Sequence, residues 1–231
     1  MEQQFSLVSI WEHGDVVTHT VAVVLLVMQF AAWTAIAMGF FRQRRFSRQR
    51  RIANRLWDKP TLEDGVASIR DESSPWKMMV MEGQQAARGF DENTCGKGQD
   101  LNAKADWIVR GLAKVLDKVS FYQSYGLTLL SSIGATAPFI GLFGTVWGIY
   151  HTLIALSGGG QMTIDQVAGP IGEALVMTAF GLVVAVPAVL GNNAIAGGNR
   201  QRLAELGMFA QELQMFLVTG QRPISTRSSQ Q

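Results

Sequence analysis

The sequence contains few residues that could serve covalent or metal chemistry. Its 231 residues include one cysteine, Cys95, and three histidines. A single cysteine excludes an intrachain disulfide and a cysteine-based metal cluster. No phosphate-binding loop, metal-ligand spacing or paired nucleophile and base appears along the chain. The sequence therefore argues against an enzyme and predicts no cofactor.

Charge is also scarce, and it is almost absent from three long stretches. Residues 16–41, 126–156 and 167–195 together contain a single Asp, Glu, Lys or Arg side chain, that of Glu173. Each stretch exceeds the roughly 20 residues that cross a hydrocarbon layer of about 30 Å. We therefore predict an all-α membrane protein with three transmembrane helices.

The basic residues are unevenly placed, and their positions predict the orientation of the chain. An arginine cluster directly follows the first stretch, whereas residues 1–15 contain acidic side chains but no Lys or Arg. The cluster consists of Arg42, Arg44, Arg45, Arg48, Arg50 and Arg51. By the positive-inside rule, the N-terminus lies outside and the cluster and C-terminus lie in the cytoplasm. Nucleic-acid binding is the alternative, but a basic run beside a hydrophobic span more often sets topology.

This orientation divides the chain into alternating outer, membrane and cytoplasmic segments. They are a periplasmic N-terminal segment (1–15), transmembrane helices (16–41, 126–156 and 167–195), a cytoplasmic helical region (42–125), a periplasmic loop (157–166) and a cytoplasmic helix and tail (196–231). We expect the first and third helices to continue into the cytoplasm as long helices. The N-terminal segment is expected to lie on the outer surface, and the last residues to be disordered.

The cytoplasmic region is predicted to be mostly helical. Residues 48–57 should extend the first helix as far as Pro60, after which Thr61 offers an N-cap. Helices are also expected over 76–89 and 101–122, separated by a polar turn at 90–100. The second of these is amphipathic, with one apolar face formed by Trp107, Leu112, Val115, Leu116 and Val119.

Small residues predict that the second and third transmembrane helices pack against protein rather than lipid. Gly141, Gly144 and Gly148 recur every three or four residues, so they form one stripe where another backbone can approach closely. The third helix shows the same pattern of small residues, which are Gly172, Ala174, Ala179, Gly181, Ala185, Ala188 and Gly191. Pro138 and Pro187 predict a bend in each helix. A short loop joins the two helices, which are therefore expected to form an antiparallel hairpin.

Three polar side chains in this hairpin are candidates for a functional site. With the loop centred between residues 161 and 162, Thr145 and Thr178 fall at the same depth. Glu173 lies roughly 7 to 8 Å nearer the loop and points about 140° away from Thr178. The commoner role of a threonine such as Thr145 is to bond the carbonyl one turn back. A carboxylate such as Glu173 is either used by the protein or lies in water at the outer interface.

One histidine of the first transmembrane stretch is a weaker candidate. His19 is close to its outer end. We interpret it as an interfacial histidine, with a proton relay as the alternative.

Two stretches of sequence resemble a known family. LLSSIGATAPFIGLFGTVWGI (129–149), followed by GPIGEALVMTAFGLVVAVPAVLGNN (169–193), closely resembles the two core helices of the MotA/TolQ/ExbB proton-channel family, in the same order and with a short loop between them. SIWEHGDVV (9–17) resembles the ExbB branch more than the shorter start of the TolQ branch. Residues 57–106 carry no motif of this kind.

The resemblance implies a function in the bacterial inner membrane. It implies a homopentameric ring, in contact with lipid, around a pair of single-span ExbD-like helices and coupled to a TonB-like energy transducer. Thr145, Glu173 and Thr178 would line the inner passage and take part in proton use. The proton motive force would then drive transport of iron-siderophore type substrates across the outer membrane. A TolQ-like subunit that energises envelope maintenance and a non-conducting scaffold around the partner helices are the alternatives; no nucleic-acid partner is expected.

Overall fold

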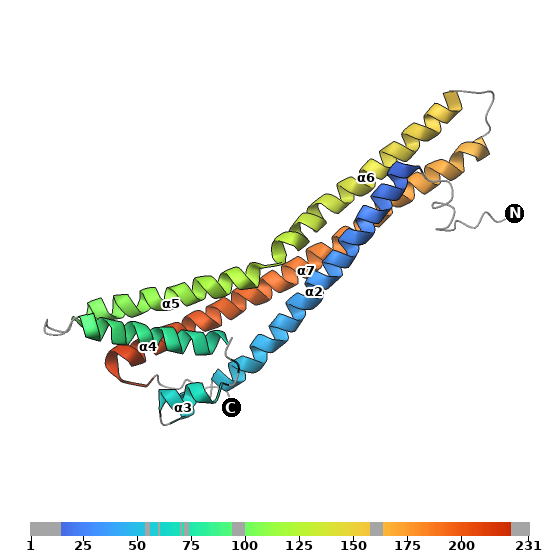
Figure 1. Cartoon of the computed structure of the whole chain (residues 1–231). Helices are drawn as coiled ribbons and strands as arrows, with labels where there is room; N and C mark the ends of the chain where they lie inside the picture. Colours follow the sequence, from blue (N-terminus) through green and yellow to red (C-terminus); the bar gives the residue numbers. More distant parts are fainter. Residues whose placement is uncertain are drawn as a thin grey trace. The chain divides into compact units, whose positions relative to one another are not determined.

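The structure is a computed structural model that describes residues 15–53, 56–59, 61–69, 71, 74–93, 100–157 and 164–222. These residues are almost entirely helical, and no β-strand occurs among them, so the predicted all-α fold is confirmed (Figure 1). The expectations for the segment before Asp15, for Cys95 and for the last nine residues, 223–231, fall outside the described residues.

Six α-helices and one 3₁₀-helix make up the described part of the chain. They are α2 (Val16–Ala53), η1 (Leu56–Asp58), α3 (Leu62–Ala67), α4 (Pro75–Asn93), α5 (Leu101–Ser124), α6 (Leu127–Ser157) and α7 (Ile164–Thr219). Three helical segments are long and apolar enough to cross a membrane: Val16–Gln49, Leu101–Ile154 and Ala168–Thr219. The prediction of three transmembrane helices is confirmed in this sense.

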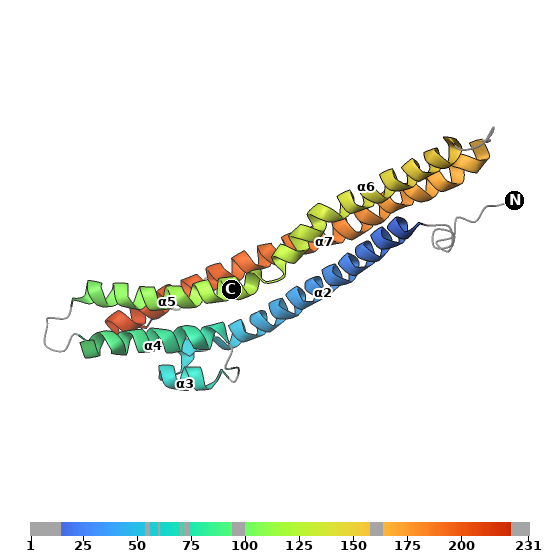
Figure 2. The ribbon, with the colours of Figure 1, turned by 45° about the horizontal axis from the view of Figure 1, so that its top comes forward.

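The helices form two compact units, and the long helices α2 and α7 contribute to both. Unit 1 contains the described residues up to Gly39 together with Gly126–Ile195. Unit 2 contains Phe40–Tyr125 and the residues from Ala196 onward. In unit 1, α6 runs beside the N-terminal part of α7, and in unit 2, α4 lies beside α5 (Figures 1 and 2).

Unit 1 is held together mainly by small and aliphatic side chains of α2, α6 and α7. Its buried cluster consists of Val21, Leu25, Ala32, Ala35, Leu130, Ile133, Ala137, Met177, Val184, Ala185, Ala188 and Ile195. The outward faces of the same helices are apolar as well, with large exposed side chains such as Phe30, Phe139 and Val183. Extensive exposed apolar surface of this kind fits a surrounding of lipid or other protein chains rather than water.

The backbones of α6 and α7 touch where the glycines face one another. A Cβ atom added to Gly141 would lie 2.6 Å from the carbonyl oxygen of Met177. One added to Gly181 would lie 2.7 Å from the carbonyl oxygen of Ala137. Both distances are too short for a real side chain, so no larger residue fits without separating the helices. Pro138 lies inside α6 and Pro187 inside α7.

Unit 2 has a core of larger side chains. Aromatic rings from different helices meet in it: Trp76 lies 5.7 Å from Phe46 and 5.1 Å from Phe209 between ring centroids. Arg202 is buried among them, with its guanidinium 5.8 Å from the centre of the Phe46 ring. Burial lowers the pKa of Arg202, and the nearby Glu205 carboxylate acts in the opposite direction.

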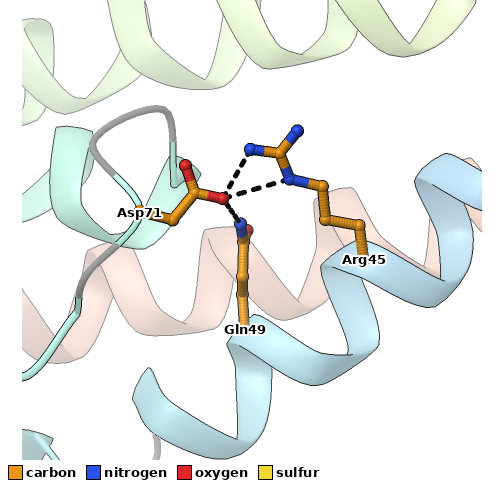
Figure 3. A network of polar contacts seen from close by, with 3 residues as sticks. All are labelled: Arg45, Gln49 and Asp71. Carbon is orange, nitrogen blue, oxygen red and sulfur yellow. Dashed lines mark hydrogen bonds and ion pairs between the residues drawn. The ribbon is translucent and has the colours of Figure 1, made fainter.

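Polar contacts fix the turns that connect the helices of unit 2. Asp71 accepts hydrogen bonds through Oδ2 from Arg45 Nε at 3.0 Å and Nη2 at 2.6 Å, and from Gln49 Nε2 at 2.5 Å (Figure 3). The predicted N-cap at Thr61 is confirmed, because Thr61 Oγ1 accepts from the backbone N–H of Asp64 at 3.1 Å.

The structure corrects three details of the helices predicted for residues 42–125. Helix α2 ends at Ala53, and Leu56–Asp58 is a 3₁₀-helix with Leu56 buried against Gly65, instead of one helix through residue 57. Helix α4 continues to Asn93, beyond the predicted start of the turn. Its last turn is held by an ion pair of 2.8 Å between Asp91 and Lys104.

The third correction concerns the buried face of α5. Leu112, Val115 and Val119 are buried as predicted, but Trp107 is 49% exposed and packs on Phe90. Ile108, fully buried, takes the core position instead. The two positions are adjacent on the helix, and the rotation of α5 against its neighbours decides which of them faces inward.

The contact at Gly181 leads to a first prediction about stability. In Gly181→Ala, the added methyl group must push α7 away from Ala137, and the mutant should lose about 1 to 3 kcal/mol through overpacking. Gly197→Ala is the matched control on the same helix, because nothing lies within 4 Å of its added Cβ atom. Thermal unfolding in detergent should show a lower midpoint for Gly181→Ala only. Equal midpoints for the two variants would contradict the close approach.

Candidate functional site

The side chains of Thr145 and Thr178 meet between α6 and α7. Their Oγ1 atoms are 2.5 Å apart, so the prediction that the two threonines lie at the same depth is confirmed. Thr145 is 6% exposed, and its Oγ1 also lies 3.2 Å from the Gly141 carbonyl oxygen and 3.1 Å from that of Ala174. The Thr145 hydroxyl therefore lies within hydrogen-bond distance of the carbonyl one turn back along its own helix and of two groups on α7.

The number of protons limits the direction of these hydrogen bonds. A hydroxyl carries one proton, and a carbonyl oxygen only accepts. The single proton of Thr145 can therefore point to the Gly141 carbonyl, the Ala174 carbonyl or Thr178, one at a time. When it points to a carbonyl oxygen, Thr178 is the donor in the bond between the two hydroxyls. This threonine link satisfies a buried polar group and ties the two helices together inside an apolar unit.

Glu173 lies on α7 beside a cavity of about 130 Å³ within unit 1. Its side chain is partly buried. Helices α2 and α6 form the rest of the wall, with Thr18 from α2 and His151 and Thr152 from α6. The volume and the polar side chains are sufficient for several water molecules. Glu173 therefore faces a polar hollow in a unit whose other surfaces are largely apolar.

The glycine stripe of α6 runs along one side of this cavity. Gly144 and Gly148 both line it. A Cβ atom on Gly144 would lie 3.0 Å from Val21 and 3.2 Å from Met177, and one on Gly148 would lie 2.8 Å from the Cβ of Ala174. Ala174 also lines the cavity, and its carbonyl oxygen faces Thr145. Ala174 of α7 thus contacts both the cavity and the threonine link.

The arginines proposed as topology determinants all lie on α2 within unit 2. Arg42 donates from Nη1 to the carbonyl oxygen of Tyr122 at 2.9 Å, and Arg45 is paired with Asp71. Arg44 and Arg48 are exposed. No cluster of three or more His, Cys, Asp and Glu side chains suited to a metal occurs in the described ranges.

Sequence reasoning missed four polar residues at the cavity: Asp15, Thr18, His151 and Thr152. Asp15 Oδ2 lies 3.3 Å from His151 Nδ1. The ring of His151 packs on that of Trp147, with 4.7 Å between centroids. His151 is the only histidine of the second transmembrane stretch, which could have marked it for attention. Its pairing with Asp15 joins residues far apart in the chain and could not be read from spacing.

Comparison with known proteins agrees with the family resemblance found in the sequence. The model of the MotA/TolQ/ExbB proton channel family matches residues 79–208, more than half of the chain. The biopolymer transport protein ExbB of Xanthomonas campestris pv. campestris (strain B100) is 38% identical over 216 residues, which cover 90% of this chain and 85% of that protein. ExbB of Neisseria meningitidis serogroup A is 37% identical over 210 residues, 90% of this chain and 96% of that protein.

A relative with a different name matches less closely. The Tol-Pal system protein TolQ of Haemophilus influenzae is 28% identical over 207 residues, which cover 85% of this chain and 86% of that protein.

The threonine link gives a second prediction. Thr145→Val keeps the shape of the side chain but removes its hydroxyl, and should lower the free energy of unfolding by about 1 kcal/mol. A double-mutant cycle with Thr178→Val should give a coupling energy of about 0.6 to 1.7 kcal/mol.

Thr136→Val serves as the control for this cycle, because Thr136 is exposed and bonds only to Ser132 of its own helix in the described contacts. Unfolding in detergent, followed by helical circular dichroism, measures all four variants. Effects of Thr145→Val and Thr178→Val that simply add would rule out the direct link.

Proposed function

Because the chain belongs to the MotA/TolQ/ExbB proton channel family, we propose that it is the inner-membrane subunit that couples the proton motive force to transport across the outer membrane. It does so with an ExbD-like single-span partner and a TonB-like energy transducer, for substrates of the iron-siderophore type. The coarser assignment, to a multi-pass membrane protein of a channel-type family in energy transduction, follows from the family and the three apolar helices.

The observation that carries this proposal is the position of Glu173. It faces a polar cavity between three apolar helices, and Ala174, whose carbonyl oxygen lies 3.1 Å from Thr145 Oγ1, lines the same cavity. Under this proposal, the Glu173 carboxyl group takes up a proton from water in this cavity and releases it again. Each protonation changes the local charge by one unit. In the proposed mechanism, this change alters how strongly the helix surface attracts the single-span partner.

The threonine link has a mechanical role in this proposal. Thr145 and Thr178 hold α6 and α7 in register while the charge of Glu173 changes. The close contact of Gly141 with Gly181 and Thr178 supports the same rigid pair. A rigid pair would pass the effect of the charge on to a neighbouring chain instead of absorbing it by a local shift.

The outward faces of unit 1 support assembly into a ring, proposed to be a homopentamer in contact with lipid. Large apolar side chains are exposed along α6 and α7, among them Phe139, Leu142, Phe143, Val183 and Val186. Copies of the same chain, the partner helices and lipid would cover these faces. The proposed orientation places the arginine cluster of α2 in the cytoplasm and the start of α2 outside.

A TolQ-like role in envelope maintenance is the second candidate, and the similarity to TolQ of Haemophilus influenzae supports keeping it. The higher identity and coverage of the two ExbB proteins favour the first. Expression of the chain in strains that lack ExbB or TolQ discriminates the two. Rescue of iron-siderophore uptake supports the first role, and rescue of envelope integrity alone supports the second.

The third prediction tests Glu173 itself. Glu173→Gln keeps the size of the side chain but cannot exchange a proton, so uptake driven by the proton motive force should fall to the level of a strain lacking the protein. The complex should still assemble, as measured by its size after purification. Glu212→Gln, an exposed acid on the same helix, should leave uptake unchanged. Normal uptake by Glu173→Gln would favour the non-conducting scaffold instead.

A further inference from the structure

We propose that Asp15 and His151 form a proton relay at the mouth of the Glu173 cavity, through which Glu173 exchanges protons with outside water. This inference rests on the proposed function of Glu173 and on the proposed orientation. It adds two residues that neither the family resemblance nor the comparisons single out. It also specifies the side from which protons reach the cavity.

The positions of the two residues place them between water and Glu173. Asp15 immediately precedes α2, and His151 is in the last two turns of α6, the end that leads to the α6–α7 loop. Both line the cavity together with Glu173. Their side chains are 55% and 44% exposed, respectively, so the pair has one side on the cavity and one on the surface. A group placed in this way can exchange protons with both.

The surroundings of His151 hold its ring in a defined orientation. Its ring packs on Trp147 and meets Tyr150 edge-on at 5.6 Å between centroids. Asp15 faces Nδ1 at 3.3 Å. A carboxylate at Nδ1 favours the tautomer that carries its proton there, which leaves Nε2 to accept and release a proton. Asp15 also stabilises the positive ring once Nε2 is protonated.

The relay step is balanced in protons. A proton from outside water binds Nε2 of His151 and gives an imidazolium ion. The imidazolium then passes one proton through cavity water to the Glu173 carboxylate, which becomes a neutral carboxylic acid, and the ring returns to its neutral form. Thr18 and Thr152 line the same cavity and can hold the intervening water by hydrogen bonds. The reverse sequence releases a proton to the outside.

The titratable groups of the cavity come from three parts of the chain. Asp15 immediately precedes α2, His151 is on α6 and Glu173 is on α7. Among the residues that the structure describes, the other titratable side chains nearby are His19, one turn after Asp15, and Tyr150 beside His151. Asp15 also sits at the N-terminus of α2, where the helix dipole favours a negative charge.

The fourth prediction tests the relay in the assembled complex of this chain with its single-span partner, reconstituted into liposomes. Proton uptake is followed with a trapped pH dye under an imposed membrane potential. His151→Phe keeps an aromatic ring against Trp147 but has no exchangeable proton, and should lower the rate about tenfold. Water in the cavity would carry the remaining flux, so the loss is smaller than for a fully required acid–base group. Asp15→Asn should also lower the rate and change its pH profile.

A chemical rescue separates a relay from a structural role. His151→Ala leaves a space open to solvent, and added imidazole should restore proton uptake in this variant. Imidazole should restore neither His151→Phe, where the ring fills the space, nor Glu173→Gln. Tyr150→Phe, which alters the same ring cluster without removing a cavity group, should conduct like the unaltered protein.

The outcomes keep the two proposals apart. Normal uptake by His151→Phe together with blocked uptake by Glu173→Gln would overturn the relay and leave the proposed function standing. Loss in His151→Ala that imidazole does not relieve would assign His151 a structural role and also overturn the relay. Normal uptake by Glu173→Gln would instead overturn the proposed function.

Discussion

The direct contact between the backbones of α6 and α7 is the constraint on which the rest of unit 1 depends. Gly141 and Gly181 face one another so closely that neither position has room for a side chain. Only at this separation can the hydroxyl of Thr145 reach both Thr178 and the Ala174 carbonyl. In an apolar surrounding, helices gain little from the hydrophobic effect, so close packing and a few buried hydrogen bonds must hold them.

The next glycines of the α6 stripe border the space in which the charged groups gather. Where α6 carries Gly144 and Gly148, a cavity opens on the side of α2, and Glu173 borders it. Polar and ionisable groups inside an apolar unit are costly and persist where they have partners or water. In unit 1, the hydroxyls of the threonine link have hydrogen-bond partners, and Glu173 borders a polar cavity that Asp15 and His151 also line.

Unit 2 is built by the opposite means. Large aromatic side chains such as Trp76 and Phe209 fill its core, and ion pairs such as Arg45 with Asp71 fix its connections. A core of this composition is typical of a protein region in water, where burying large apolar side chains is the main driving force. The long helices α2 and α7 contribute mostly small and aliphatic side chains to the core of unit 1, and aromatic ones such as Phe46 and Phe209 to the core of unit 2.

Local sequence determined most of the fold. Long uncharged stretches predicted the three apolar helices, the glycine spacing predicted close packing, and loop symmetry predicted that Thr145 and Thr178 lie level. Each of these follows from length or period along one helix. What only the tertiary structure decided depends on how the helices are rotated against one another. That rotation puts Ile108 rather than Trp107 in the core, pairs Asp15 with His151, and opens the cavity beside Glu173. Spacing along a chain carries no information about such pairs, because side chains far apart in sequence meet only after the helices have docked.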